Sequence, residues 1–224
     1  MAIIKNILGT ITGRIGDIVV RTVNGKSVAS VRPSKYNASQ SSQAVFNRNR
    51  FSVTVSFAKY VNFIPLLSKV WSTARIQGVS AFNKILKCNV KLSGKEHPSE
   101  CNIITPSGYT IELNEVEFEK DFISIEVCRE IKFAETQCDY CVIIVFAFYQ
   151  PLKQGISHFV MSHSVKQLKM PGQTSLIRIS LDDNQKQFRE LYSYCNIYVA
   201  EIIESQKHDK PVWSSSVTRT ISFD

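Results

Sequence analysis

The sequence predicts an α+β protein dominated by β-structure: an N-terminal β-hairpin plus short helices, then a seven-stranded immunoglobulin-like β-sandwich. Three observations support this class. Two β-rich runs flank an Asn-Gly dipeptide near the N-terminus, an apolar pattern of helical period follows, and seven strand-like segments separated by turn residues fill the rest. With 224 residues, 44% of them hydrophobic, the chain is long enough to bury such a core.

The hairpin is the clearest local feature. Its strands are expected over residues 15–23 and 26–32. Asn24 and Gly25 between them tolerate the positive φ angles of a two-residue type I′ turn. Gly13 and Gly16 precede the hairpin, where glycine permits a bulge or a close backbone approach. Because an isolated hairpin is only marginally stable, we expect it to pack on the rest of the chain or on a neighbouring subunit.

Three helices are expected after a polar linker. The first begins at Gln43 and ends before Pro65, which cannot continue a helix. Its apolar face consists of Phe46, Val53, Phe57, Tyr60 and Ile64, which recur with the helical period. A second helix is expected from Leu66 to about Ile76, and a third, capped by Ser80, to about Leu86.

After a polar break at residues 93–100, only strands are expected. They lie near residues 109–118, 121–128, 139–149, 155–163, 174–181, 192–203 and 211–223. The run from Cys141 to Tyr149 is apolar throughout, as in a central strand buried on both faces. Two domains follow from this reading: a basic docking module at 1–95, made of hairpin and helices, and an immunoglobulin-like or fibronectin-like sandwich at 96–224.

Charge is divided unevenly between these two parts. Between Ile18 and Lys95 there is no Asp or Glu, while thirteen Lys and Arg residues occur up to Lys95. Residues 1–100 hold 15 basic and 3 acidic residues, and residues 101–224 hold 12 basic and 16 acidic ones. Folding needs no such segregation, so it indicates a basic surface that meets an acidic protein or a polyanion.

The candidate docking residues are basic side chains from the hairpin, the linker and the first helix. They are Arg14, Arg21, Lys26, Arg32, Lys35, Arg48 and Arg50. One partner is an acidic surface of a neighbouring protein subunit, within an oligomeric assembly. The other is nucleic acid, because aromatic residues such as Tyr36, Phe51 and Phe63 interleave with the basic ones, as in single-strand binding. Helical spacing alone, however, places Phe46 and Phe57 on a buried face.

No catalytic, cofactor-binding or metal-binding residue is expected. The chain lacks a P-loop, a dinucleotide fingerprint, a nucleophile elbow and an H-E-x-x-H motif. Cys138 and Cys141 have the spacing of half a zinc site, but the other half is missing, so buried strand cysteines are the simpler reading. Glu115, Glu117 and Glu119 alternate with apolar residues, which is typical of the solvated face of an edge strand.

Location is also constrained by the sequence. No apolar run approaches the roughly 18 residues needed to span a bilayer, and the N-terminus does not have the pattern of a signal peptide. We therefore expect a virion or cytoplasmic protein without membrane contact, in which the six cysteines are reduced thiols.

The N-terminal residues resemble a protein family of Bacteroidota and their phages. Residues 13–26 read G-R-I-G-D-I-V-V-R-T-V-N-G-K, with Val28, Arg32 and Pro33 beyond and Asn47-Arg48 before the helix. They are similar to the family's motif G-K-x-G…G-K-x-x-x-R-x-x-P, with Arg14 in place of the usual lysine. The polar stretch with Gln40 and Gln43 is similar to the family's T-x-x-Q. The resemblance extends to about residue 90 and implies a protein without an assigned enzyme activity.

These features lead to one functional hypothesis and one alternative. The hypothesis is a non-enzymatic structural subunit of a large assembly, in concrete terms a phage virion component in the tail or associated with the capsid. It docks through its basic N-terminal module, because edge strands and hairpins can add to neighbouring subunits by main-chain pairing. The alternative is a basic cytoplasmic protein that binds nucleic acid.

Overall fold

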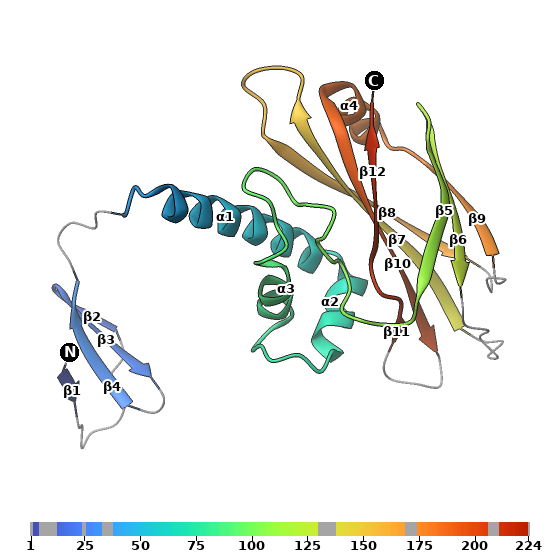
Figure 1. Cartoon of the computed structure of the whole chain (residues 1–224). Coiled ribbons are helices and arrows are strands. Elements are labelled where there is room, and N and C mark those ends of the chain that lie inside the picture. Colours follow the sequence, from blue (N-terminus) through green and yellow to red (C-terminus); the bar gives the residue numbers. More distant parts are fainter. Residues whose placement is uncertain are drawn as a thin grey trace. The chain divides into compact units, whose positions relative to one another are not determined.

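The computed structural model describes residues 2–4, 13–23, 26–32, 38–129, 138–168, 174–205 and 211–223 (Figure 1). The chain forms two compact units, Met1–Ser42 and Gln43–Asp224, and each is described by itself. The first unit thus ends well before residue 95, where the charge distribution changes. The architecture is α+β and dominated by antiparallel β-sheets, as the sequence predicts.

The first unit is a four-stranded antiparallel sheet. Its strands are β1 (Ala2–Ile4), β2 (Gly13–Ile15), β3 (Ile18–Val23) and β4 (Lys26–Val31), in the order β1-β4-β3-β2. The predicted hairpin is confirmed, because β3 and β4 pair with Val23 opposite Lys26. Its turn residues, Asn24 and Gly25, lie outside the described residues.

A second tight turn separates β2 from β3. Ile15 pairs with Ile18, so Gly16 and Asp17 form a two-residue connection. Gly16 has φ +56°, and glycine at the first central position of such a turn is typical of type II′. Gly13 has φ +138°, which also favours glycine. The strand predicted to begin at residue 15 is therefore interrupted, and its longer part begins at Ile18.

The three predicted helices are confirmed in the second unit. They are α1 (Ser42–Phe63), α2 (Pro65–Thr73) and α3 (Ala81–Asn89). Pro65 occupies the first position of α2, where its missing N–H costs nothing, and the Ser80 hydroxyl accepts a hydrogen bond from the Asn83 N–H at the start of α3. The Lys84 Nζ donates to the carbonyls of Ser72 and Ala74 at 2.8 and 2.9 Å and so caps the end of α2.

The rest of the second unit is built on two antiparallel sheets. The smaller consists of β5 (Ile111–Phe118), β6 (Phe122–Arg129) and β9 (Thr174–Ser180), in the order β5-β6-β9. In the larger, β7 (Cys138–Pro151) lies between β8 (Phe159–Leu168) and β10 (Tyr192–Ser205), and β10 also pairs with β11 (Val212–Trp213) and β12 (Val217–Ser222). The segment predicted as one strand at 211–223 is thus divided in two.

A fourth helix corrects the prediction of strands alone in this half. Helix α4 spans Asp183–Leu191, between β9 and β10. Its N-terminus has a capping box: the Gln185 N–H donates to the Asp182 carboxylate at 2.7 Å, and the Gln185 side-chain oxygen accepts from the Asp182 N–H at 3.0 Å. This Asp-x-x-Gln spacing was readable in the sequence, but the helix is short. None of the described helices is long and apolar enough to cross a bilayer.

Two hydrophobic cores share the strands β7 and β10. One core lies between the two sheets, with Phe146 and Ile197 facing Ile125 and Ile177. The other lies on the opposite face of the larger sheet, where α1, α2 and α3 bury their apolar sides (Figure 1). The helices therefore belong to the same compact unit as the sheets, although the charge pattern had placed them in a separate module.

A buried ion pair closes one end of the inter-sheet core. The guanidinium of Arg129 on β6 donates to both carboxylate oxygens of Glu201 on β10, at 2.5 and 2.8 Å, and the two residues are 1% and 0% exposed. The hydroxyls of Tyr109 and Tyr140 lie in the same cluster. Burial, followed by the charge of Glu201, raises the pKa of both hydroxyls, so they stay protonated. The pair links one sheet to the other.

We expect Arg129→Met to lower the free energy of unfolding by about 3–5 kcal/mol, because it leaves a buried carboxylate without its counter-charge. The double variant Arg129→Met/Glu201→Leu should recover most of that loss, since both desolvated charges are removed. Urea unfolding monitored by circular dichroism measures both. A double variant as unstable as the single one would show that the two residues do not act as a pair.

Candidate docking surfaces

The predicted docking residues are divided between the two units. Arg14, Arg21 and Lys26 lie on strands of the N-terminal sheet, Arg32 follows β4, and all four are exposed. Arg48 and Arg50 lie on α1 in the second unit. Lys35 lies outside the described residues. Two surfaces therefore have to be considered separately.

Strand register places the basic residues of the sheet on one face. Directly paired residues in antiparallel strands point to the same side, and successive residues alternate. Arg14 pairs with Val19, Arg21 pairs with Val28, and Lys26 pairs with Val23. Val19, Arg21 and Val23 occupy every second position of β3, so their side chains point to one face. Their paired residues, including Arg14 and Lys26, point to the same face. We call this the basic face: Arg14, Val19, Arg21, Val23, Lys26, Val28 and Ser30.

The opposite face of the sheet carries no charge. Its described positions on β2, β3 and β4 are Gly13, Ile15, Ile18, Val20, Thr22, Ser27, Ala29 and Val31, which we call the uncharged face. The Gly16-Asp17 turn is responsible for this separation. If one strand ran from Ile15 to Arg21 without a turn, these two side chains would point to the same face. The turn instead pairs Ile15 with Ile18, on the opposite face from Arg21.

The sheet buries little of its own apolar surface. Among its described residues, Val20 is the hydrophobic residue that is buried, at 5% exposure. Ile15 and Val31 are 68% and 73% exposed, and Ile18 and Val23 are about half exposed. A sheet needs an apolar face packed against another layer to be stable by itself. This unit therefore presents surfaces suited to contact with another molecule.

On α1, basic and aromatic residues line an open groove. Arg48, Arg50, Phe51 and Lys59 contribute to it, together with Val90 after α3. The Arg50 guanidinium lies 5.4 Å from the centre of the Phe46 ring and donates to the Asn47 side-chain oxygen at 3.3 Å.

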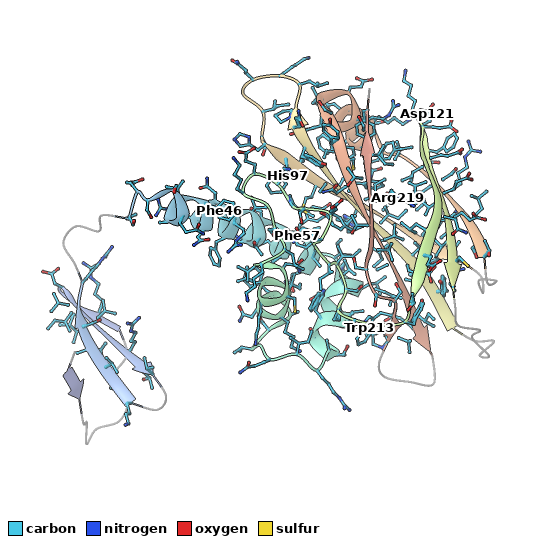
Figure 2. The ribbon with its side chains drawn as sticks, viewed as in Figure 1. Phe46, Phe57, His97, Asp121, Trp213 and Arg219 are labelled. Carbon is cyan, nitrogen blue, oxygen red and sulfur yellow. The ribbon has the colours of Figure 1, made fainter. Side chains whose placement is uncertain are left out.

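Phe46 differs from its predicted position on the buried face of α1. It is 38% exposed, whereas Phe57 is fully buried and its ring centroid lies 5.6 Å from that of Tyr198. Figure 2 shows the two phenylalanines far apart along α1, with Phe57 beside the sheet. The period of the helix is correct, but its first turns extend beyond the larger sheet, so Phe46 lies outside the core that buries Phe57.

Burial keeps two titratable side chains of the second unit, Tyr60 and Cys195, in their neutral forms. The Tyr60 hydroxyl on α1 lies 2.9 Å from Nδ1 of His163 on β8. Burial, followed by the charge of Asp182, raises the pKa of Tyr60 to about 12. The fully buried Cys195 thiol has a pKa well above its ordinary value because of desolvation, which suppresses the reactive thiolate.

Two histidines that lie far apart in the sequence come together at one small pocket. His97 and His158 line it with Glu96, Tyr149 and Gln150. The His97 ring stacks on Tyr149 at 3.9 Å between ring centroids. None of the side chains lining this pocket is a serine, threonine or cysteine nucleophile.

The cysteine pair and the acidic cluster of the sequence both lie in the second unit. Cys141 is buried in β7, and the side chain of Cys138 lies outside the described residues. Within the described ranges, no three His, Cys, Asp or Glu side chains gather in a way that could hold a metal ion. β5 is confirmed as an edge strand, with Glu115 and Glu117 exposed.

Comparison with known proteins adds little. No family model and no curated protein matches the chain. Two crystal structures of β-glucosidase from Kluyveromyces marxianus, one of them in complex with glucose, are 13% and 14% identical to this chain. They match 53% and 54% of this chain and 14% and 15% of the enzyme, both with a TM-score of 0.25. The chain thus spans about a seventh of that enzyme, and the likeness is too low to carry an argument.

We expect His163 to make stability depend on pH. Burial lowers its pKa below 6.5, and the charge of Asp182 opposes this only in part. The unfolded chain therefore binds more protons, so the contribution of this residue is fully present above pH 6.5 and is lost as the pH falls below it. Urea unfolding of wild type and His163→Gln between pH 7.5 and 5 should show a smaller pH dependence in the variant. The control His158→Gln, which removes an exposed histidine, should behave as wild type.

Proposed function

We propose that this chain is a non-enzymatic structural subunit of a large assembly and that its N-terminal sheet docks on acidic surfaces of neighbouring subunits. One observation carries the proposal: on the described residues of β2, β3 and β4 the strand charges lie on a single basic face, and Val20 is the hydrophobic side chain that these residues bury. A surface of one sign is suited to steering and orienting a partner of the opposite sign. The second unit, with two cores of its own, acts as the body that carries this sheet.

We further infer that the second unit contains a fibronectin-like variant of the immunoglobulin sandwich. β5, β6 and β9 correspond in order to the strands A, B and E of that fold. β7, β10 and β12 correspond to C, F and G, with β8 beside β7 at the edge. Sandwiches of this kind occur in many proteins that act by binding rather than catalysis, although fold alone does not decide function.

Within this class, a phage virion component in the tail or associated with the capsid is our concrete proposal. Its support is the resemblance of the N-terminal motif to proteins of Bacteroidota and their phages. A small sheet with two open edge strands, β1 and β2, also suits an assembly, because edge strands can pair with strands of adjacent subunits.

We expect the chain to sediment with large particles when lysates of its source are separated on a density gradient and probed for this protein. The triple variant Arg14→Glu/Arg21→Glu/Lys26→Glu should leave the particle fractions, because it reverses the charge of the basic face. The matched control Lys91→Glu/Lys120→Glu/Lys153→Glu makes the same net change at exposed positions of the second unit and should stay with the particles. Wild-type protein found only at the top of the gradient would contradict the proposal.

Nucleic-acid binding is the second candidate, favoured by the groove in which Arg48, Arg50 and Lys59 flank the exposed ring of Phe51. It predicts a gel shift with random single-stranded DNA at about 50 mM salt that weakens by orders of magnitude as salt rises. Phe51→Ala should then reduce binding at every salt concentration. Under the leading proposal no shift occurs at about 50 mM salt, and a salt-sensitive shift would reverse the ranking of the two functions.

A further inference from the structure

We propose that the uncharged face of the N-terminal sheet is a contact between two copies of this chain, centred on Ile18. This inference rests on the proposed function, because it names one neighbour in the assembly as a second copy. It concerns the face of the sheet opposite to the basic face, and it is carried by different residues.

Three exposed aliphatic side chains form a continuous row on this face. Ile15 pairs with Ile18, and Ile18 pairs with Val31, so the three lie side by side across β2, β3 and β4. They are 68%, 45% and 73% exposed. Neighbouring aliphatic side chains with this much exposure are characteristic of an interaction site rather than of scattered surface residues.

The row is complementary to itself. Ile18 lies in the middle, with one aliphatic side chain on each side. A two-fold axis over Ile18, parallel to the strands, brings this residue against Ile18 of the second copy and Ile15 against Val31 of the second copy. Each residue then meets an aliphatic partner, as an isologous contact requires. No other surface is needed to complete the arrangement.

The charge distribution favours contact between two copies through their uncharged faces and disfavours contact through their basic faces. Residues 1–42 contain six basic residues and one acidic residue, so their net charge is +5. Two copies that met through their basic faces would oppose like charges, which is unfavourable. Packed sheets lie about 10 Å apart, so contact through the uncharged faces leaves both basic faces pointing outward.

The resulting pair covers aliphatic surface that one copy leaves exposed. On the same face Val20 and Ser27 are already buried within one copy, at 5% and 9% exposure, so the contact lies at the end of the sheet where Ile15, Ile18 and Val31 are exposed. The two outward basic faces stay accessible to acidic neighbours. Self-association and acidic docking thus use opposite sides of one sheet.

Disulfide trapping tests the position of the axis. The full-length variant Ile18→Cys, oxidised mildly with copper phenanthroline, should give a disulfide-linked dimer on a non-reducing gel, with the linkage mapped by mass spectrometry to position 18 of both chains. The matched control Val19→Cys places a thiol on the adjacent residue of the basic face and should give no more dimer than the native cysteines give. Equal cross-linking of both variants, or none at position 18, overturns the proposal.

Light scattering during size-exclusion chromatography tests the contact without a cross-link. Wild type should have twice the 25.4 kDa mass of one chain. Val31→Glu should raise the dimer dissociation constant by about tenfold or more. Val23→Glu makes the same change at an exposed valine of the basic face and should leave the dimer intact. A wild-type monomer at concentrations on the order of 100 μM, or equal weakening by both substitutions, overturns the proposal.

These outcomes are separable from those for acidic docking. The wild-type chain could prove monomeric while the triple variant Arg14→Glu/Arg21→Glu/Lys26→Glu still fails to associate with particles. That result refutes only the contact between two copies. If the chain dimerises through Ile18 but never enters particles, the proposed assembly role fails and the dimer stands.

Discussion

The antiparallel pairing of β7 with β10 is the interaction on which the second unit depends. The two strands are in register from Pro151 opposite Tyr192 to Cys138 opposite Ser205, and both faces are buried along Tyr140–Phe148 and Cys195–Ile203. One face contributes to the core between the sheets, and the other to the core under the helices. Because neither face meets water, a polar side chain can remain there only with partners. Asn196, for example, donates to the Pro98 carbonyl at 3.0 Å and accepts from the Thr220 hydroxyl at 2.8 Å.

The N-terminal sheet shows the opposite situation with the same kind of secondary structure. Its strands are paired by main-chain hydrogen bonds, but its described residues bury one hydrophobic side chain, Val20. Its two faces differ: the basic face carries Arg14, Arg21 and Lys26, and the uncharged face carries the exposed aliphatic row of Ile15, Ile18 and Val31. Contacts with other molecules can bury the apolar side chains that the described part of this sheet leaves exposed. For this reason our leading functional proposal concerns this sheet, whereas the alternative of nucleic-acid binding concerns the groove on α1 in the second unit.

Most helices and strands could be predicted because their signals are local. Asn24-Gly25, Pro65 and Ser80 each act on the few residues beside them, and the elements they delimit are present. The periodicity of the sequence does not predict helix α4, although its capping box is visible, because nine residues between two strands give only a weak periodic signal. Charge alone identifies the candidate docking residues in the sequence. That Arg14, Arg21 and Lys26 share one face could not be predicted, because this depends on the Gly16-Asp17 turn. The turn places Arg14, rather than Ile15, on the same face as Arg21.

The sequence by itself determined the types of the main elements and the segregation of charge, because both follow from neighbouring residues and composition. Only the tertiary structure decided where the compact units divide. Charge composition changes near Lys95, but the chain divides after Ser42. The physical reason is that α1–α3 must bury their apolar sides, and the surface that accepts them comes from strands far along the chain, as in the contact of Phe57 with Tyr198. Packing between distant segments, and not charge, sets the boundary.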